Sequence, residues 1–153
     1  MEAIALLVND HKLLRGLLGE LEKSTPRAAK TRRSLLEKIK ALVEAHTAIE
    51  EEIFYPAFKE GGTKADDDRM YFEALEEHRA AGELVLPDLL NTDPASEQFG
   101  GRAKVLKEMI EHHAGEEEKD MFPRARKLLD LAARKALGEK MAVRRKELLG
   151  RNA

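Results

Sequence analysis

The feature that most constrains this chain is an internal repeat in which matching residues lie 67 positions apart. Four of the five histidines, two glutamates and two prolines belong to it. The pairs are His11 and His78, His46 and His113, Glu50 and Glu117, and Pro56 and Pro123. A repeat of this kind indicates a duplicated structural unit. Because most of the repeated side chains carry nitrogen or oxygen donors, duplication would place six potential metal ligands around one pseudo-two-fold axis.

The composition restricts both the class of protein and the kind of site. With 153 residues, the chain is long enough for one domain with its own core. It contains no cysteine, which excludes disulfides, zinc–thiolate fingers and iron–sulfur clusters. Any bound metal must therefore use imidazole and carboxylate groups.

Two further observations bear on location and partners. The N-terminus, Met1-Glu2-Ala3-Ile4-Ala5, lacks the basic region of a signal peptide, and no apolar run approaches the length of a membrane span. The formal net charge is −2, and 37% of the residues are charged, with both signs mixed along the chain. We therefore expect a soluble cytoplasmic protein, a monomer or weak dimer, that presents no nucleic-acid or membrane surface.

Apolar residues recur at helical spacing in four long segments. The segments cover residues 2–23, about 28–59, about 66–90 and about 95–127, and short clusters of turn-forming residues separate them. Pro56, Pro87 and Pro123 should each kink a helix or distort its last turns. Loops this short join antiparallel neighbours, so the predicted fold is an all-α, up-down-up-down four-helix bundle.

A fifth helix is expected at about residues 131–149, with Asp130 as its N-cap. We thus expect a bundle at residues 1–128 and a C-terminal helix at residues 129–153 that packs on the bundle or extends it. This helix is rich in lysine and arginine, which an anionic partner would explain. Acidic residues are interspersed, however, and favour a solvated face on a helix that packs through Leu137, Met141 and Leu148.

The repeated histidines and glutamates occupy positions in the apolar stripes of the expected helices. His11 and His78 each stand where an apolar residue is expected in the first and third helices. In the second and fourth helices the stripe contains a histidine and, four residues later, a glutamate. Residues at i and i+4 stack on one helix face, so both side chains can reach one metal cluster. All six donors are therefore expected to point into the bundle.

Burying these six groups requires compensation. A His-x-x-x-Glu pattern alone is weak evidence in a glutamate-rich chain, so the argument depends on placement. An unpaired buried carboxylate costs several kcal/mol. A proton or a surface location would compensate for one residue, whereas a metal cluster compensates for all six. The alternative is a set of surface residues and core histidines with ordinary hydrogen-bond partners, and the repeat favours the metal cluster.

The donor set narrows the choice of metal. Four imidazoles and two carboxylates without a thiolate suit octahedral iron or manganese, and zinc would also accept them. Two carboxylates able to bridge favour a binuclear site. Ferritin-like bundles use a Glu-x-x-His pattern instead, which these stripes do not contain.

These residues resemble the hemerythrin-like family, the His-His-Glu cation-binding domains, in its bacterial single-domain type. The resemblance covers about residues 1–128 and rests on Asp10-His11, His46-Thr47-Ala48-Ile49-Glu50 with Phe54-Tyr55-Pro56, Glu77-His78-Arg79, and His113-Ala114-Gly115-Glu116-Glu117 with Phe122-Pro123. It implies a four-helix bundle with a non-haem di-iron centre, in preference to manganese or zinc. The terminal ligands would be His11, His46, His78 and His113. Glu50 and Glu117 would be bridging carboxylates, and an oxo or hydroxo bridge would complete the core.

The chain departs from the oxygen-carrying members in one respect. Those carriers have a fifth histidine one turn from the ligand of the third helix, whereas this chain has Ala74 and Gly82 around His78. Neither side chain can bind a metal. Two-fold symmetry then leaves an open position on both metals, which favours exchange and redox turnover over reversible oxygen carriage.

Other polar residues near the stripes are assigned different roles. His112 lies about 100° around the helix from His113, so it is expected to be exposed or to assist the ligands. Glu116, four residues after His112, lies on the same face of the helix, outside the stripe. The residues expected on a solvated face are Glu51, Glu52 and Glu118. Tyr71, one heptad before the histidine of the third helix, is expected to be a core tyrosine or a hydrogen-bond partner of a metal-bound species.

The favoured function is a di-iron protein that binds and reacts with hydrogen peroxide, dioxygen or nitric oxide. Catalase-like peroxide dismutation is one form of it. No dedicated acid–base residue is visible in the stripes, so redox chemistry is assigned to the metal centre. One alternative is a non-enzymatic module that senses or stores oxygen or iron through a separate partner, and another is a metal-free structural bundle.

Overall fold

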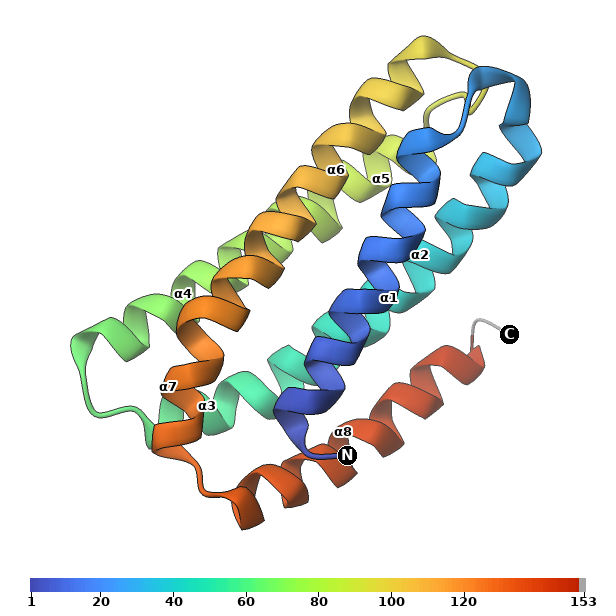
Figure 1. Ribbon diagram of the computed structural model, residues 1–153. Coiled ribbons are helices and arrows are strands. Elements are labelled where there is room, and N and C mark those ends of the chain that lie inside the picture. Colours follow the sequence, from blue (N-terminus) through green and yellow to red (C-terminus); the bar gives the residue numbers. More distant parts are fainter. Residues whose placement is uncertain (152–153) are drawn as a thin grey trace.

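The computed structural model describes residues 1–151, and every regular element in that range is a helix (Figure 1). Four antiparallel rods form a bundle, and a fifth helix lies across it. The first rod is the single helix α1 (Ala3–Lys23). Each of the other three consists of two α-helices joined by a wide π-helical turn. The predicted all-α bundle with an additional C-terminal helix is confirmed.

The second rod follows a 3-10 turn, η1 (Pro26–Ala28), and consists of α2 (Ala29–Ile49), η2 (Glu50–Phe54) and α3 (Tyr55–Gly61). The third consists of α4 (Ala65–His78), η3 (Arg79–Val85) and α5 (Leu86–Leu90). The fourth consists of α6 (Glu97–Glu116), η4 (Glu117–Met121) and α7 (Phe122–Leu128). The last helix is α8 (Leu131–Arg151). These rods match the predicted segments to within a few residues.

A proline explains each wide turn. Pro56, Pro87 and Pro123 are each the second residue of the α-helix that follows a π-helical turn. Proline has no N–H, and its ring clashes with the carbonyl four residues earlier, so a regular α-helix cannot pass through it undisturbed. A turn closed by hydrogen bonds between residues five apart makes room for the ring. The expected distortions at the three prolines therefore take this form, and two of the turns begin at Glu50 and Glu117.

The core consists of two apolar clusters on either side of a polar layer. One cluster fills the end where α3, α7 and the start of α1 meet, and it includes Phe54, Phe58 and Phe122. The other fills the opposite half of the bundle, where leucines surround Phe99. The repeated histidines and glutamates lie between them, and all but His113 are buried. Hydrophobic burial on both sides thus fixes the spacing of the rods around the polar layer.

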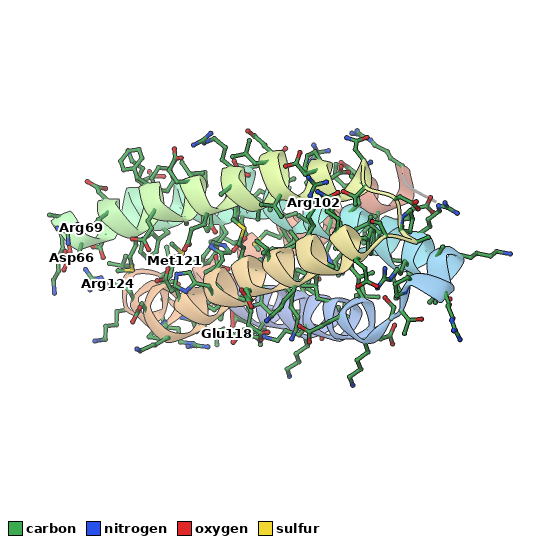
Figure 2. The ribbon with its side chains drawn as sticks, turned by 90° about the horizontal axis from the view of Figure 1, so that it is seen from above. Asp66, Arg69, Arg102, Glu118, Met121 and Arg124 are labelled. Atoms are coloured by element: carbon green, nitrogen blue, oxygen red, sulfur yellow. The ribbon has the colours of Figure 1, made fainter. Side chains whose placement is uncertain are left out.

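Charged side chains cover the outside of the rods and their ends. Seen from above, Asp66, Arg69 and Arg124 lie at the end of the bundle where α4 begins (Figure 2). Arg124 Nε there donates to Asp67 Oδ1 at 2.8 Å and connects α7 to α4. Among the helices of residues 1–151, none is long and apolar enough to cross a membrane.

The C-terminal helix α8 packs against α1 and α2 (Figure 1). Its predicted N-cap is confirmed, because Asp130 Oδ1 accepts a hydrogen bond from the backbone N–H of Ala133 at 2.8 Å. Met141 is fully buried, as its place on the apolar face predicts. Gly138 faces the chain start so closely that a Cβ atom would clash with the backbone of residues 1–3.

We expect Gly138→Ala to lower the free energy of unfolding by about 1–3 kcal/mol, because α8 must move away from α1 to admit one methyl group. Thermal or urea denaturation measures the change. Gly150→Ala is the matched control, since nothing lies within 4 Å of a Cβ at that position on the same helix. Equal stability of both variants would show that α8 does not pack closely on the chain start.

Candidate metal centre

The structure brings all six sequence-predicted ligand residues into the polar layer. The histidines come from α1, α2, α4 and α6, and the two glutamates are the first residues of η2 and η4. The donors form two triads, and within each triad the donor atoms lie within 4.8 Å of one another. The triads are His11, His46 and Glu117, and Glu50, His78 and His113. Five of the six side chains are buried, and His113 is 12% exposed.

Each glutamate contacts both triads. Glu50 Oε1 lies 3.0 Å from His46 Nε2 and 3.0 Å from His78 Nε2. Glu117 Oε1 lies 3.1 Å from His11 Nε2 and 3.4 Å from His113 Nε2. Both carboxylates are thus placed between the two sets of imidazoles, as groups that bridge two cations would be.

A second carboxylate lies behind each histidine, at the Nδ1 atom that faces away from the centre. Asp10 Oδ2 is 3.1 Å from Nδ1 of His46, and Glu77 Oε1 is 2.7 Å from Nδ1 of His113. Two more pairs, at 2.9 and 3.2 Å, are Glu118 with His11 and Glu51 with His78. These outer carboxylates are also 67 positions apart in pairs, so the repeat is larger than the six donors.

Glu51 and Glu118 are partly exposed and lie outside both triads, as expected, but they do more than form a solvated face. Their side chains are 46% and 30% exposed, but one carboxylate oxygen of each contacts a buried imidazole. Each residue points away from the centre on its own helix and reaches the histidine of a neighbouring helix. A stripe on a single helix does not reveal such a contact between helices.

The outer carboxylates fix which nitrogen of each ring faces the centre without a proton. A carboxylate accepts the Nδ1–H, so in the neutral ring the Nε2 lone pair points inward. The Nε2 atoms of His78 and His113 are 3.0 Å apart, and His46 Nε2 and Glu50 Oε2 are buried without a hydrogen-bond partner. Converging lone pairs and unpaired buried oxygen repel one another unless a positive charge lies between them. The donor set therefore fits metal cations.

Without a metal, protons must supply that positive charge. Burial lowers the pKa of His46, but the Glu50 charge and the hydrogen bond to Asp10 outweigh it and raise the pKa to about 10. Burial raises the pKa of Glu50, but the positive charge on His46 outweighs it and holds the pKa well below the usual value. For Glu117, burial and the neighbouring Glu50 charge both raise the pKa. In the metal-free centre, protons on these histidine and glutamate side chains therefore balance the buried charge.

Tyr55 is the residue of the centre that sequence reasoning missed. It is fully buried, and its hydroxyl donates to Glu117 Oε2 at 2.8 Å. The same oxygen lies 3.1 Å from Nε2 of both His78 and His113, so it faces the point on which the donors converge. Burial and the charges of Glu117 and Glu50 raise the pKa of Tyr55 well above its usual value. The hydroxyl therefore keeps its proton at neutral pH.

This tyrosine breaks the symmetry of the repeat. Its counterpart 67 positions later is Phe122. The two rings occupy similar places, since Tyr55 stacks on His78 at 5.3 Å and Phe122 stacks on His11 at 5.8 Å. Only one half of the centre therefore receives a hydroxyl group. The expectation of two equivalent half-sites does not hold for the surrounding side chains.

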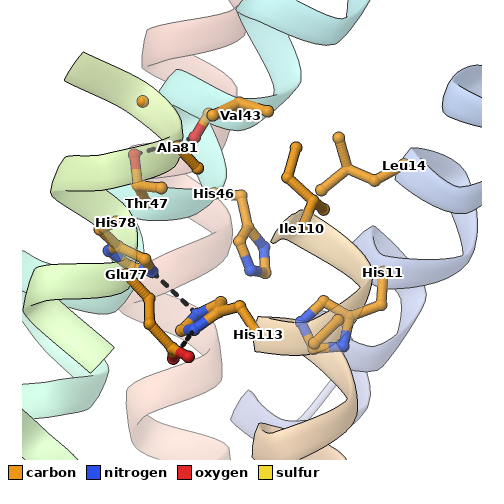
Figure 3. A pocket seen from close by; sticks show the side chains of 12 residues that line it. His11, Leu14, Val43, His46, Thr47, Glu77, His78, Ala81, Ile110 and His113 are labelled. Carbon is orange, nitrogen blue, oxygen red and sulfur yellow. Dashed lines mark hydrogen bonds and ion pairs between the residues drawn. The ribbon is translucent and has the colours of Figure 1, made fainter. Parts of the chain in front are cut away.

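The other side of the centre is a small apolar cavity of ≈ 30 Å³ (Figure 3). All four histidine rings form its floor, and its walls come from α1, α2, α6, the end of α4 and the middle of η3. The apolar wall residues are Leu14, Val43, Ala81, Gly82, Ile110 and Ala114. Glu50, Glu117 and Tyr55 do not line it, and Glu77 is the carboxylate among its lining residues.

The remaining predicted residues have clear places. His112 is 65% exposed and contacts Glu116 at 3.2 Å and Glu77 at 3.5 Å, as expected for a residue outside the centre. Tyr71 is partly buried and packs edge-on against Tyr55, with ring centroids 6.4 Å apart. It is thus a core tyrosine. Glu52 pairs with Arg144 at 2.8 Å on the surface.

Fold and centre together define a helical bundle whose interior holds histidine and glutamate clusters suited to cations. Comparison with known families agrees, because the model of the hemerythrin HHE cation-binding domain matches residues 2–125. The chain belongs to this family.

Two relatives and one solved structure are similar over nearly the whole chain. The uncharacterized proteins Rv2633c of Mycobacterium tuberculosis (strain ATCC 25618 / H37Rv) and Mb2666c of Mycobacterium bovis are each 28% identical over 151 residues, which is 98% of this chain and 89% of each relative. The crystal structure of the Rv2633c homolog from Mycobacterium kansasii, a hemerythrin HHE cation binding domain-containing protein, has a TM-score of 0.84 at 27% identity. It matches 98% of this chain and 88% of its own.

We expect metal binding to release protons and to tighten as the pH rises. Because the pKa of His46 is about 10 in the metal-free protein, its imidazole is protonated at neutral pH and must lose that proton to bind a metal. The apparent affinity for Zn(II) should then rise about tenfold per pH unit for each proton released. Calorimetric titration in buffers of different ionisation enthalpy counts these protons. An affinity that does not change between about pH 7 and pH 9 would contradict the assignment.

Proposed function

We propose that this chain is a non-haem di-iron protein that reacts with small oxidants: hydrogen peroxide, dioxygen or nitric oxide. The metal ligands would be His11, His46, Glu50, His78, His113 and Glu117. The observation that carries the proposal is the position of Glu50 and Glu117, each in contact with one histidine of each triad. We place the metal centre in residues 1–128 and treat the protein as a cytoplasmic monomer or weak dimer, with the last helix packed on the bundle.

Iron in such a centre supplies one-electron changes between Fe(II) and Fe(III), which manganese or zinc would not supply in the same way. The chain's own residues account for the rest. Four outer carboxylates hold the imidazoles in one tautomer and one orientation. The apolar cavity beside the imidazoles admits molecules of a few atoms and keeps bulk water away.

Tyr55 gives the centre the proton donor that the helix stripes lack. Its hydroxyl keeps its proton at neutral pH and points at the donors of the triad that contains His78 and His113. A positioned donor can give a hydrogen bond or a proton to an oxygen atom of a bound oxidant. Peroxide dismutation to water and dioxygen requires proton movement of this kind, which favours the catalase-like form of the proposal.

The direct test measures how fast iron-loaded protein consumes peroxide and releases dioxygen. We expect a rate well above that of the same concentration of free iron in the same buffer. The absorption spectrum is recorded before and after peroxide addition, to establish that the metal centre changes. A rate no faster than that of free iron would contradict the catalytic form.

We expect Tyr55→Phe to retain the metal and to slow peroxide consumption by about 10²-fold or more, the usual effect of losing a positioned acid–base group. The repeat itself carries phenylalanine at position 122, so the ring without its hydroxyl suits this packing. Phe122→Leu is the control for disturbed packing near the centre. An unchanged rate in Tyr55→Phe, or an equal loss in Phe122→Leu, would remove Tyr55 from the proposal.

A second candidate is a non-enzymatic sensor of oxygen or iron, and one chain of contacts favours it. His46 Nδ1 contacts Asp10, and Asp10 Oδ1 accepts from Arg145 on α8 at 2.7 Å. A change in the charge or position of His46 would thus alter the contact between Asp10 and the C-terminal helix. Stable, reversible, oxygen-dependent absorption would favour this candidate, whereas rapid autoxidation would favour turnover.

A further inference from the structure

We propose that the oxidant reaches the centre between α2 and η3, past Gly82. The inference rests on the proposed function, because it describes how the substrate of that centre arrives. It also limits the substrate to small neutral molecules.

Two neighbouring cavities mark the route. The inner one is the apolar cavity of ≈ 30 Å³ beside the imidazoles (Figure 3). The outer one is a surface groove of ≈ 380 Å³ between α2 and the α4–η3 segment. The two share the wall residues Val43, Thr47, His78 and Gly82. Only this thin wall separates the metal centre from solvent on that side, and one of its members has no side chain.

The repeat shows why the opposite side is closed. Under the offset of 67, Gly82 corresponds to Arg15, and Ala81 corresponds to Leu14. The Arg15 guanidinium makes two hydrogen bonds of 3.0 Å to Glu118, and its Nε donates to Glu111 at 3.1 Å. These ion pairs tie α1 to α6 and η4 beside His11. On the η3 side, alanine and glycine stand in place of leucine and arginine, and the wall is left thin.

The side chains of the wall offer no free hydrogen-bond donor to a passing molecule. The Thr47 hydroxyl donates to the backbone carbonyl of Val43 at 2.9 Å. The His78 Nδ1 is engaged with Glu51 at 3.2 Å. An ion would have to lose its hydration here without compensation, whereas a neutral molecule passes at little cost.

The charge of the outer groove excludes anions as well. Four of its lining residues are carboxylates, namely Glu44, Glu51, Glu76 and Glu83. Its cation, Arg79, is already paired with Glu76 at 3.0 Å. The surface around the route is therefore negative and repels anions such as superoxide or hydroperoxide. Dioxygen, nitric oxide and undissociated hydrogen peroxide are neutral and small enough for the inner cavity.

The test uses a substitution that narrows the route, and it measures the rate constants of nitric oxide binding and release. In Gly82→Leu, the new Cβ atom meets nothing within 4 Å, so the helix admits the larger side chain at this shared wall position. Gly101→Leu is the matched control, because it is a helical glycine with equally open space on an exposed part of α6. Nitric oxide binding to the Fe(II) protein is followed by stopped-flow absorption, after iron content is shown to be unchanged.

A narrowed route slows arrival and departure equally, since the bound and free states are the same. We expect both rate constants of Gly82→Leu to fall by roughly tenfold or more with an unchanged ratio, and those of Gly101→Leu to equal the native values. Native rates in Gly82→Leu overturn the route. A changed ratio also overturns it, because Gly82 would then shape the binding cavity. Absence of nitric oxide binding by the native protein would instead overturn the proposed function, and the route with it.

A readout without iron chemistry complements the kinetics. In protein loaded with diamagnetic Zn(II), dissolved dioxygen should relax the methyl protons of Val43 and Ile110, which line the inner cavity. Ile39 is the internal control, since it is fully buried in the second apolar cluster and lines neither cavity. Equal relaxation of all three would show that no neutral molecule gathers beside the centre.

Discussion

The rest of the structure depends on one electrostatic constraint: two buried carboxylates must be neutralised by whatever lies between four inward-facing imidazoles. The outer carboxylates accept hydrogen bonds from Nδ1–H, so in the neutral rings the Nε2 atoms have only lone pairs to offer. Protons on the imidazoles neutralise part of the carboxylate charge, as the raised pKa of His46 indicates. Metal cations satisfy all the donors at once. The two apolar clusters on either side keep water from hydrogen-bonding to these groups, and they hold the helices at the required distance.

The duplicated sequence explains the symmetry of this arrangement, and its departures explain what the centre can do. Ten polar residues of the centre obey the offset: six donors and four outer carboxylates. Two differences matter for chemistry. Tyr55 corresponds to Phe122 under the offset and gives one half a hydroxyl. Gly82 stands at the position that corresponds to Arg15 and leaves one wall thin. A proton donor and an opening on the half that contains His78 suit turnover of a small molecule better than symmetric storage.

Much of this was predictable from sequence, because helical periodicity is local along the chain and the 67-residue repeat relates the two halves directly. Helix limits, Asp130 as a cap and the inward direction of the six donors follow from spacing alone. Tyr55 was missed because the turn before Pro56 is wide: the Tyr55 N–H donates to the carbonyl of Glu50, five residues back. The regular α-helical spacing does not hold through such a turn, so it does not place Tyr55 at the centre. The contacts of Glu51 and Glu118 with the histidines were missed because these partners lie on other helices.

The most direct test of the central claim is the metal content of protein expressed with ample iron, measured by mass spectrometry. The six-donor centre predicts about two ions per chain, and the loss of most of them in a His46→Ala, His113→Ala double variant. His112→Ala, which removes the exposed neighbour of His113, should keep the native content. Fewer than about one ion per native chain, or equal loss in the two variants, would contradict a metal centre at these residues.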